Sequence, residues 1–548
     1  MTRTLLLCTV LLAGCDALYG TVRDRTPCAS SAGCPVGQFC ASAGAARVCW
    51  EDAVPPVVGG VAVSCSTSPC LRDAVLTVEA QASDDQELGA VTVALDLDGG
   101  ARAVTMARVS GALHRATLDL SEWPVAGLTA TATATVTARD GARTVRAVTA
   151  AVGQRPVVTR VRGAVELAVG AVVVPTAPAL LDDGTVLVGG STGRLYTVAP
   201  GASSAEVSGA ALAAAIVHPP AVGQSALWVA AGNRLFAVAA DRSRVLNGAG
   251  YDTGGSISGP AAVTAAAPTA GAPEVAFVGS AGGRMAAVKA EATTDNGIIN
   301  FTRSIAPFTS SPILVDDATL YAVSGTPSPA AATLRRFSYD GALGEGFTRA
   351  VGQLVTSPLA AGAPGGGAAA SAGVWTGTAE LSASTLRQTL PDGTPGTSIP
   401  LGASVGGGAV VLSNGDVAFC VADQLHRYTA AGAPAWASPA PLDGAGLTPI
   451  ALAGPTGPPT LLVPTRSGTV HAVHAGTGAP LWSVSLSVNE LREGTVRAAA
   501  GAPTSTAWFT SADGLLHGLV VDGALDTSAP WPKAWHDARN TGNLATAR

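Results

Sequence analysis

Short stretches in which apolar and polar residues alternate, each closed by Asp, Gly or Pro, fill most of the chain beyond residue 55. Examples are AVLTVEAQAS, AVTVALDLDGG and ATLDLSEW. A two-residue period places successive side chains on opposite faces of an extended strand. With 66 Gly and only 13% charged residues, the composition also favours strands and turns over helices. The pattern therefore predicts an all-β protein.

The first block of such stretches spans residues 55–154 and follows EDAVPPVVGG, whose paired prolines predict a linker. About seven short strands in roughly 100 residues predict a two-sheet sandwich. The order of ASDDQELGAVTVALDLDG and VTARDGARTV resembles that in bacterial Ig-like domains. Asp96, Asp98, Gly99 and Gly100 match a calcium loop only in part, because the third acidic ligand and the closing Glu are missing. A hairpin turn is predicted there instead.

From about residue 160 the chain repeats a unit of two β-runs that flank a polar turn. Equivalent positions recur every 40 to 50 residues. They are Leu195, Leu235, Met285, Leu334, Leu381, Leu425, Val470 and Leu515. Such a period with about four short strands per unit is typical of a propeller blade. Residues 155–548 are therefore predicted to form an eight-bladed β-propeller, with seven blades as the alternative.

The stretch RVRGAVELAVGAVVV, residues 160–174, precedes the first complete unit. We expect it to pair with the last repeat, because closing the ring removes sheet edges that would otherwise be exposed. The hypothesis is that strands from both ends of the repeat region close the propeller.

The segment AVHAGTGAPLW resembles the tryptophan-docking repeat of pyrroloquinoline-quinone-like (PQQ-like) propellers, whose pattern is A-x-D-x-x-T-G-x-x-x-W. Thr477, Gly478 and Trp482 match this pattern, while His474 replaces the aspartate. A shortened copy, YTAAGAPAW, ends in Trp436, and PWPKAWHDARNTGN near the C-terminus also resembles a segment common in this superfamily. The resemblance implies that Trp436, Thr477, Gly478 and Trp482 pack blades against one another.

The N-terminal segment MTRTLLLCTVLLAGCD has a basic residue, an apolar run too short to cross a bilayer, and small residues before a cysteine. This layout predicts an export signal. The stretch LLAGC resembles the lipobox of bacterial lipoproteins. The resemblance implies that residues 1–14 are removed and that Cys15 carries a lipid anchor. We therefore expect a cell-envelope protein held at the outer membrane by its lipid, on either the surface or the periplasmic face.

Six further cysteines cluster at the start of the exported chain: Cys28, Cys34, Cys40, Cys49, Cys65 and Cys70. An even number of cysteines in an exported protein predicts disulfides, and the sequence leaves their connectivity open. Residues 15–54 are too few for a hydrophobic core and are predicted to form a disulfide-rich spacer. Zinc is the alternative, but close Cys-x2-Cys pairs and a nearby histidine are missing. Cys420, inside VAFCVA, is expected to be a buried thiol.

Candidate chemical groups are sparse and poorly spaced. His471 and His474 lie three residues apart, which points them to opposite faces of a strand and argues against a shared metal. GGSTG places Ser191 in a nucleophile-elbow pattern, but that motif needs strand, turn and helix where a blade offers strand, turn and strand. The pairs Asp182–Asp183 and Asp316–Asp317 fit hairpin turns. No catalytic, cofactor-binding or metal-ligating residue is predicted.

The PQQ-like superfamily includes quinone-dependent dehydrogenases, and that resemblance would imply an adjacent cysteine pair, a calcium cluster and a catalytic aspartate. The chain has no adjacent cysteines. Its net charge of -6 and lack of a basic patch argue against nucleic-acid binding. We therefore predict a non-enzymatic envelope lipoprotein whose propeller binds a protein or a polysaccharide and uses no cofactor. The alternatives are a periplasmic lipoprotein resembling the outer-membrane-assembly propellers and, second, a quinone-dependent dehydrogenase.

Overall fold

A computed structural model describes residues 26–546, except residues 36–37, 44, 52–53, 86–87, 98–99, 124–126, 141–146, 152–155, 170–172, 266–273, 291–297, 302–305, 328–329, 341, 356, 363–371, 380–383, 455–458 and 498–502. Cys15 and the signal segment 1–14 lie outside the described residues, as do Asp98 and Gly99. Apart from two short 3-10 helices, the regular structure of the described chain is all β. Within it, no helix has the length and apolar character needed to span a membrane. The chain folds as two compact units, residues 1–125 with 129–159, and residues 126–128 with 160–548.

The first unit begins with a small disulfide-bonded hairpin. Disulfides join Cys28 to Cys40 and Cys34 to Cys49. The buried cluster of the hairpin consists of cysteines alone, so the bridges take the place of a hydrophobic core. Because these cysteines are paired with one another, they leave no thiolate for the alternative zinc site. The elements of the hairpin are η1 (Ser31–Gly33), β1 (Gln38–Ala43) and β2 (Ala46–Glu51).

The rest of the first unit is a sandwich of two sheets. One sheet has the strand order β3-β5-β9-β8, and the other has the order β4-β12-β10-β6-β7 with β11 beside β10. The elements are β3 (Val57–Cys65), β4 (Cys70–Leu71), β5 (Val75–Ser83), β6 (Leu88–Leu97), β7 (Gly100–Thr105), β8 (Ala107–Ser110), β9 (Leu113–Asp119), η2 (Leu120–Glu122), β10 (Thr129–Asp140), β11 (Ala147–Ala151) and β12 (Val157–Thr159).

Alternation along the strands gives each sheet of the sandwich one buried face. In β5 every second residue from Leu76 to Ala82 is buried, and these side chains pack with those of β6 and β10 around Trp123. The third disulfide, Cys65–Cys70, links the end of β3 to the start of β4. The unit extends to Thr159, beyond the predicted boundary at residue 154, because β12 pairs with both β10 and β4.

The second unit contains eight sheets of four or five strands among the described residues. The first four sheets are β14 (Ala179–Leu180), β15 (Val186–Gly189), β16 (Arg194–Val198) and β17 (Glu206–Ala211); β18 (Ala221–Val222), β19 (Ala226–Ala231), β20 (Arg234–Ala239) and β21 (Tyr251–Asp252); β22 (Ala262–Val263), β23 (Val275–Gly279), β24 (Met285–Lys289) and β25 (Ile298–Phe301); and β26 (Ile313–Asp316), β27 (Thr319–Pro327), β28 (Ala330–Tyr339) and β29 (Leu343–Gly352).

The last four sheets complete the unit. They are β30 (Leu354–Val355), β31 (Ala360–Gly362), β32 (Gly373–Ala379), β33 (Ser384–Thr389) and β34 (Pro395–Leu401); β35 (Val410–Val411), β36 (Val417–Val421), β37 (Gln424–Tyr428) and β38 (Ala440–Pro441); β39 (Ile450–Ala453), β40 (Thr460–Pro464), β41 (Thr469–His474), β42 (Pro480–Ser485) and β46 (Ala524–Leu525); and β43 (Thr495–Val496), β44 (Thr504–Thr510), β45 (Leu515–Asp522) and β13 (Val161–Glu166).

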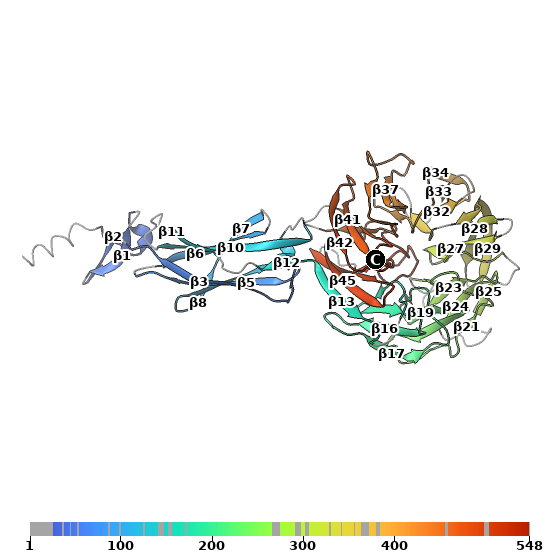
Figure 1. The fold of residues 1–548 in the computed structure, drawn as a ribbon, viewed down its shortest axis with the longest axis horizontal. Coiled ribbons are helices and arrows are strands. Elements are labelled where there is room, and N and C mark those ends of the chain that lie inside the picture. Colours follow the sequence, from blue (N-terminus) through green and yellow to red (C-terminus); the bar gives the residue numbers. More distant parts are fainter. Residues whose placement is uncertain are drawn as a thin grey trace, which may run out of the picture. The chain divides into compact units, whose positions relative to one another are not determined.

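These sheets are the blades of a ring (Figure 1). Each pair of neighbouring blades shares a buried apolar cluster, so both faces of every sheet are covered. The repeated apolar positions lie on the third strand of their blades, from Leu195 on β16 to Leu515 on β45. In the fifth blade, Leu381 lies outside the described residues, and the buried leucine of β33 is Leu386. The predicted all-β propeller is confirmed.

The eighth blade is built from both ends of the second unit. Strand β13 pairs antiparallel with β45, from Val161 opposite Leu519 to Glu166 opposite Leu515. The hypothesis that residues 160–174 pair with the last repeat is confirmed for this strand.

Tryptophans near the ends of two blades pack on the blade that follows. Trp436 is buried and donates from Nε1 to the backbone oxygen of Ala475 at 3.0 Å. Its ring lies against Gly478, where φ is +77° and an added Cβ would come within 2.8 Å of the indole. This close approach explains the glycine. Trp482 is half-buried, and the guanidinium carbon of Arg160 lies 5.4 Å from the centre of its ring.

Candidate functional site

The axis of the ring is filled by the end of the chain, residues 526–546, which we call the axial segment (Figure 1). From Trp531 to Gly542 it meets the innermost strands in blade order: β35, β39, β14, β18, β22 and β26. In each of these strands one backbone N–H donates to a carbonyl of the axial segment at 2.7–2.9 Å. In β43, the hydroxyl of Thr495 donates to the oxygen of Ala538 at 3.1 Å.

Local sequence keeps the axial segment out of regular structure. Pro530 and Pro532 lack the N–H that a helix or ladder needs. Trp535, His536 and Asn540 have positive φ angles of 55°, 74° and 57°. The backbone of the axial segment therefore curves, and this brings its successive carbonyl groups to the axis-facing edges of the innermost strands. Unpaired N–H groups on such buried edges would be costly, so the axial segment supplies the acceptors that these six innermost strands need.

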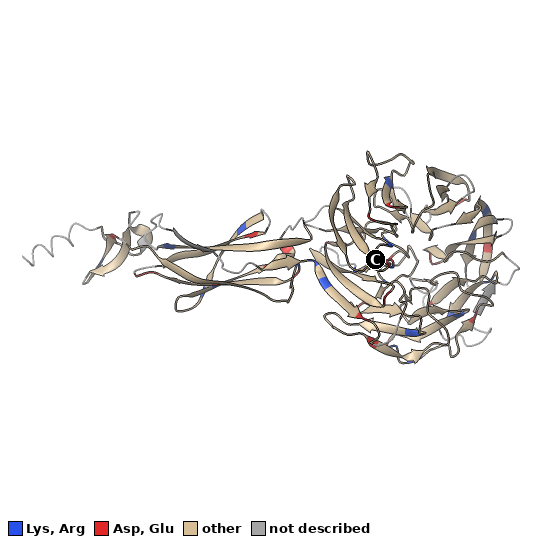
Figure 2. Ribbon diagram, viewed as in Figure 1, with Lys and Arg blue, Asp and Glu red and all other residues tan. Residues whose placement is uncertain are grey.

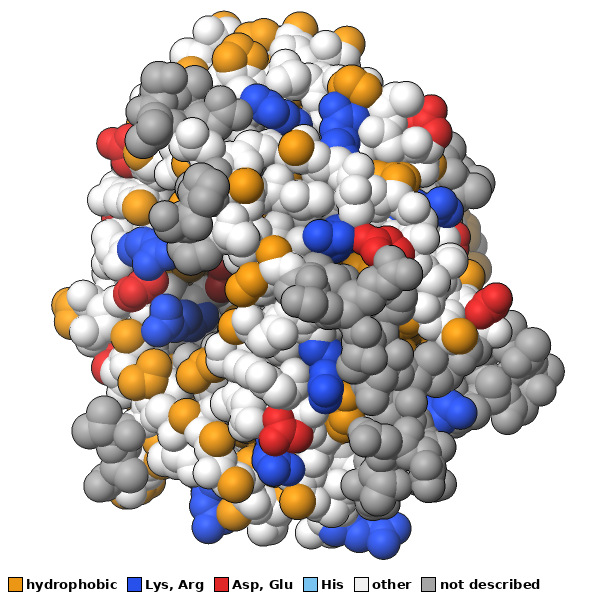
Figure 3. Space-filling view, turned by 90° about the vertical axis from the view of Figure 1, so that its right-hand side faces the viewer, with side chains coloured by type: hydrophobic (Ala, Val, Ile, Leu, Met, Phe, Trp, Pro, Cys, Tyr) orange, Lys and Arg blue, Asp and Glu red, His pale blue; other side chains and the backbone are white. Residues whose placement is uncertain are grey.

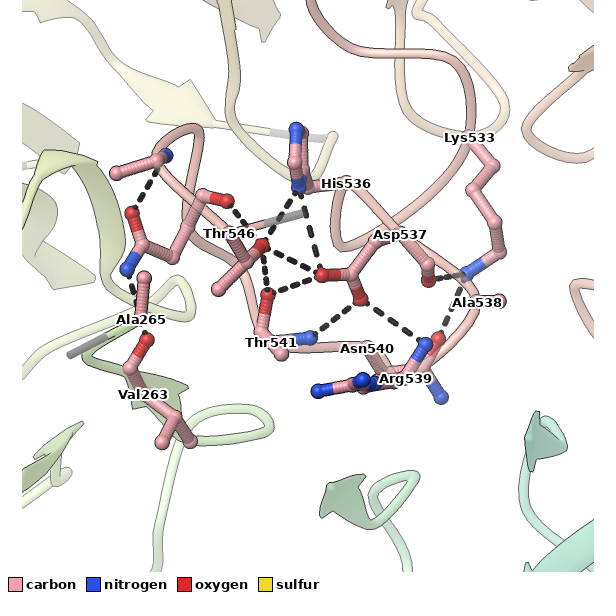
Figure 4. A network of polar contacts seen from close by, with 12 residues as sticks. Val263, Ala265, Lys533, His536, Asp537, Ala538, Arg539, Asn540, Thr541 and Thr546 are labelled. Carbon is pink, nitrogen blue, oxygen red and sulfur yellow. Dashed lines mark hydrogen bonds and ion pairs between the residues drawn. The ribbon is translucent and has the colours of Figure 1, made fainter. Parts of the chain in front are cut away.

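Asp537 organises the axial segment (Figure 4). Its Oδ1 accepts the backbone N–H groups of Arg539 and Thr541, both at 3.0 Å. Its Oδ2 accepts the hydroxyls of Thr541 and Thr546, both at 2.6 Å, and lies 3.6 Å from Nδ1 of His536. Burial raises the pKa of Asp537, but the His536 ring and the two hydroxyls outweigh it and lower the pKa to about 2. The fully buried carboxylate is therefore charged and saturated with donors.

Lys533 is the second buried charge of the axial segment. Its Nζ donates to the backbone oxygens of Ala534 at 2.7 Å and Asp537 at 3.0 Å, and to Oδ1 of Asn540 at 2.6 Å. Asn540 in turn donates to the oxygen of Pro178, just before β14, at 3.1 Å. Burial lowers the pKa of Lys533 to about 7, although Asp537 counteracts this. Three acceptors match the three N–H donors of an ammonium group.

The aspartate pairs of the first and fourth blades also hold the axial segment. As the turn prediction requires, Asp183 and Asp316 each accept a backbone N–H two residues on, at 2.8 Å. The other member of each pair reaches the axis, because Asp182 lies 2.6 Å from the guanidinium of Arg539 and Asp317 accepts from the amide of Asn543 at 2.8 Å. The turn explanation was therefore incomplete.

A cavity of about 370 Å³ opens beside the axial segment. It lies among the loops that lead into β14, β18 and β43 and the turn between β15 and β16. Its volume falls in the range of about 300–1,000 Å³ that is usual for small-molecule sites. The polar and aromatic residues of its lining are Thr176, Ser191, His218, Arg492, Glu493 and Trp535.

Glu493 and His218 give the cavity its polarity. Within the described part of the chain, no hydrogen bond or ion pair joins the Glu493 carboxylate to another residue. Burial raises the pKa of Glu493, while Arg492 and other cations nearby partly oppose the shift. Burial lowers the pKa of His218, whose Nε2 lies 3.0 Å from the oxygen of Ile257. At neutral pH the ring is therefore mainly uncharged, and its Nδ1 can serve as an acceptor.

The histidines singled out in the sequence lie in separate environments. His471 Nε2 lies 2.8 Å from Oδ1 of Asp443. His474 Nδ1 accepts the N–H groups of Gly476 at 3.0 Å and Thr477 at 3.2 Å, so it shapes the turn that carries Gly478. The two rings therefore have different partners.

Ser191 and Cys420 also have local roles. Ser191 lies in the turn between β15 and β16, and its Oγ accepts the N–H of Val174 at 3.0 Å. Two strands flank this turn, where a nucleophile elbow needs a helix. Cys420 is fully buried in β36, and burial raises the pKa of its thiol.

A quinone cofactor does not fit the ring axis of this chain. The space there is held by the axial segment, whose carbonyls are bonded to six innermost strands. The sequence also has no adjacent cysteine pair to stack on a quinone.

No protein-family profile matches the sequence, and no curated protein matches it. Among solved structures, the chain is similar to BamB from Moraxella catarrhalis, with a TM-score of 0.46 and 13% sequence identity over 63% of this chain and 95% of that one. The class of the second unit, an all-β propeller, follows from its own strand pairing and shared blade cores.

Proposed function

We propose that the protein is a non-enzymatic, lipid-anchored protein of the cell envelope whose propeller binds a protein or polysaccharide partner. The filled axis is the observation that supports this proposal. Since the protein's own chain occupies the centre of the ring, recognition is left to the loops at the two ends of the blades and to the cavity beside Trp535.

The charge distribution supports a partner other than a nucleic acid. Charged residues are sparse on the ribbon of the ring (Figure 2), and on the face in Figure 3 the visible basic and acidic side chains are scattered among uncharged ones. The net charge of the chain is -6. Phosphate backbones are bound by clustered Lys and Arg, whereas proteins and neutral glycans need no such field.

Protease shaving of intact cells that express the full-length chain tests the proposal. We expect external protease to release propeller fragments, because a lipid at Cys15 followed by the sandwich would present the ring outside the cell. Cys15→Ser is the matched control, since it should move the protein into the soluble fraction without altering the ring. Protection from protease together with co-purification of a β-barrel assembly complex would replace this proposal with the periplasmic assembly role.

A further inference from the structure

The cavity beside the axial segment lies at the junction where the ring closes. Its lining comes from the first, second and eighth blades and from Trp535 of the axial segment. The loops before β22, β26 and β39 contain no charged residue or histidine and read SGPAAV, SSPIL and LTPIA, while the loop before β18 has His218. The eighth blade instead has LREGTV, which puts Arg492 and Glu493 in adjacent positions. Arg492 also lies 3.4 Å from Oε1 of Glu490 through Nη1, which leaves its remaining guanidinium N–H groups and the Glu493 carboxylate for recognition.

The lining combines hydrogen-bond acceptors and donors, and it contains both an acidic and a basic side chain. Glu493 offers carboxylate oxygens, His218 offers Nδ1, and Arg492 offers guanidinium N–H groups. Ser191 accepts from Val174 through its Oγ and keeps its hydroxyl proton for a ligand. An acid and a base in one cavity disfavour a ligand of either charge, whereas a neutral ligand with many hydroxyls can use every one of these groups.

Trp535 adds an apolar surface to this polar lining. Its side chain is half-buried, and the ammonium of Lys533 lies 5.8 Å from its ring centroid. Its backbone oxygen accepts the N–H groups of Asp537 and Gly542, both at 3.0 Å, which holds the residue at a φ of 55°. A non-glycine residue in this region is uncommon and costs conformational energy. The backbone of Trp535 is thus held in place, and the residue lines the cavity, where the C–H face of a sugar ring can pack on its half-buried indole.

We propose that this cavity binds one uncharged sugar residue of a glycan, with Trp535 packing on the ring and Glu493, Arg492, His218 and Ser191 bonding its hydroxyls. The inference rests on the proposed binding function and narrows its partner to a neutral polysaccharide.

The test is isothermal titration of the purified full-length protein in detergent with neutral mono-, di- and trisaccharides of glucose, galactose, mannose and the N-acetylhexosamines. Choline and citrate serve as cationic and anionic probes. We expect at least one saccharide to bind and Glu493→Gln to weaken it on the order of tenfold, since a hydrogen bond to a charged group is lost. Glu206→Gln is the matched control, because Glu206 is exposed on β17 in the same ring, and it should bind as the wild type does.

A second variant, Trp535→Leu, checks the aromatic wall with its melting curve recorded alongside, and it should also weaken saccharide binding. The inference is overturned if no saccharide binds, if choline or citrate binds in preference, or if Glu493→Gln and Glu206→Gln bind equally well. These outcomes are separate from those of protease shaving. A propeller released from cells that binds no sugar leaves the envelope-binding proposal standing, and a protected propeller contradicts that proposal whatever the titrations show.

Discussion

Two distant parts of the chain close the same ring in different ways. At the outer edge, β13 adds a strand to β45 through backbone bonds, with one irregularity between Val161 and Gly163, whose φ is +106°. At the axis, residues 526–546 make one or two backbone bonds to each of several strands and depend on buried side chains, above all Asp537 and Lys533. The difference teaches that outer closure depends on backbone pattern, while axial closure depends on particular residues.

Removing the outer strand should have the largest effect. Deletion of residues 161–166 exposes the edge of β45 and uncovers the cluster that includes Val165 and Leu516. We expect the melting temperature of the propeller to fall on the order of 10 °C and aggregation to increase. Ala164→Thr, at an exposed position of β13, keeps the strand and should melt like the wild type. An unchanged melting curve after the deletion would refute closure by β13.

Breaking the axial network should come next. Asp537→Ala leaves several donors without their acceptor and should lower the free energy of unfolding in urea by about 3–5 kcal/mol. The matched variant Asp182→Ala removes only an exposed ion pair to Arg539 and should cost less than about 1 kcal/mol. If the two variants lost equal free energy of unfolding, the axial segment would be held mainly by its backbone bonds. It would then close the ring in the same way as β13.

The two closures also differ in what the sequence could predict. The blades follow from a local pattern, because each repeat carries its own alternating runs and a buried residue such as Leu195 or Val470. The role of residues 160–174 follows from the same pattern, because a strand predicted before the first complete repeat needs a partner strand at the edge of another blade. The end of the sandwich was misplaced because β12 is only three residues long, too short to show a period.

The axial segment and the cavity could not be predicted in this way. Asn540 bonds to Pro178 across 362 residues of sequence, and no periodicity links the two. The candidate site joins His218, Glu493 and Trp535 from three different parts of the chain. One available signal was the adjacent pair Arg492–Glu493 in a chain with 13% charged residues, at a place where other repeats, such as SGPAAV and SSPIL, have no charged residue. Aligning the loops before the innermost strands of all repeats would have singled out the eighth blade.

A pair of tryptophans sharpens the comparison at the junction of the ring. Trp436 packs on Gly478 of the next repeat, whereas Trp482 packs on Arg160, which precedes β13 and pairs with Asp522. We expect Trp436→Ala to cost about 3–5 kcal/mol in urea unfolding. Trp482→Ala should cost roughly 1 kcal/mol, because this ring is only half-buried. A larger loss for Trp482 than for Trp436 would mean that the junction is held more tightly than the repeats.

Acid gives the smallest and most selective test of the axial network. In the folded protein, the pKa of Asp537 is lowered from 3.8 to about 2 by hydrogen bonds that outweigh burial, so its charged form stabilises the fold above about pH 4 and this contribution is lost as the pH falls towards 2. Asp537→Asn lacks that titration. The difference in free energy of unfolding between wild type and Asp537→Asn should therefore shrink between pH 4 and pH 2, as measured by urea titrations at each pH. If the free energies of unfolding of wild type and Asp537→Asn changed in parallel with pH, the charge of Asp537 would contribute nothing to stability. The axial closure would then resemble that of β13 in needing no charge.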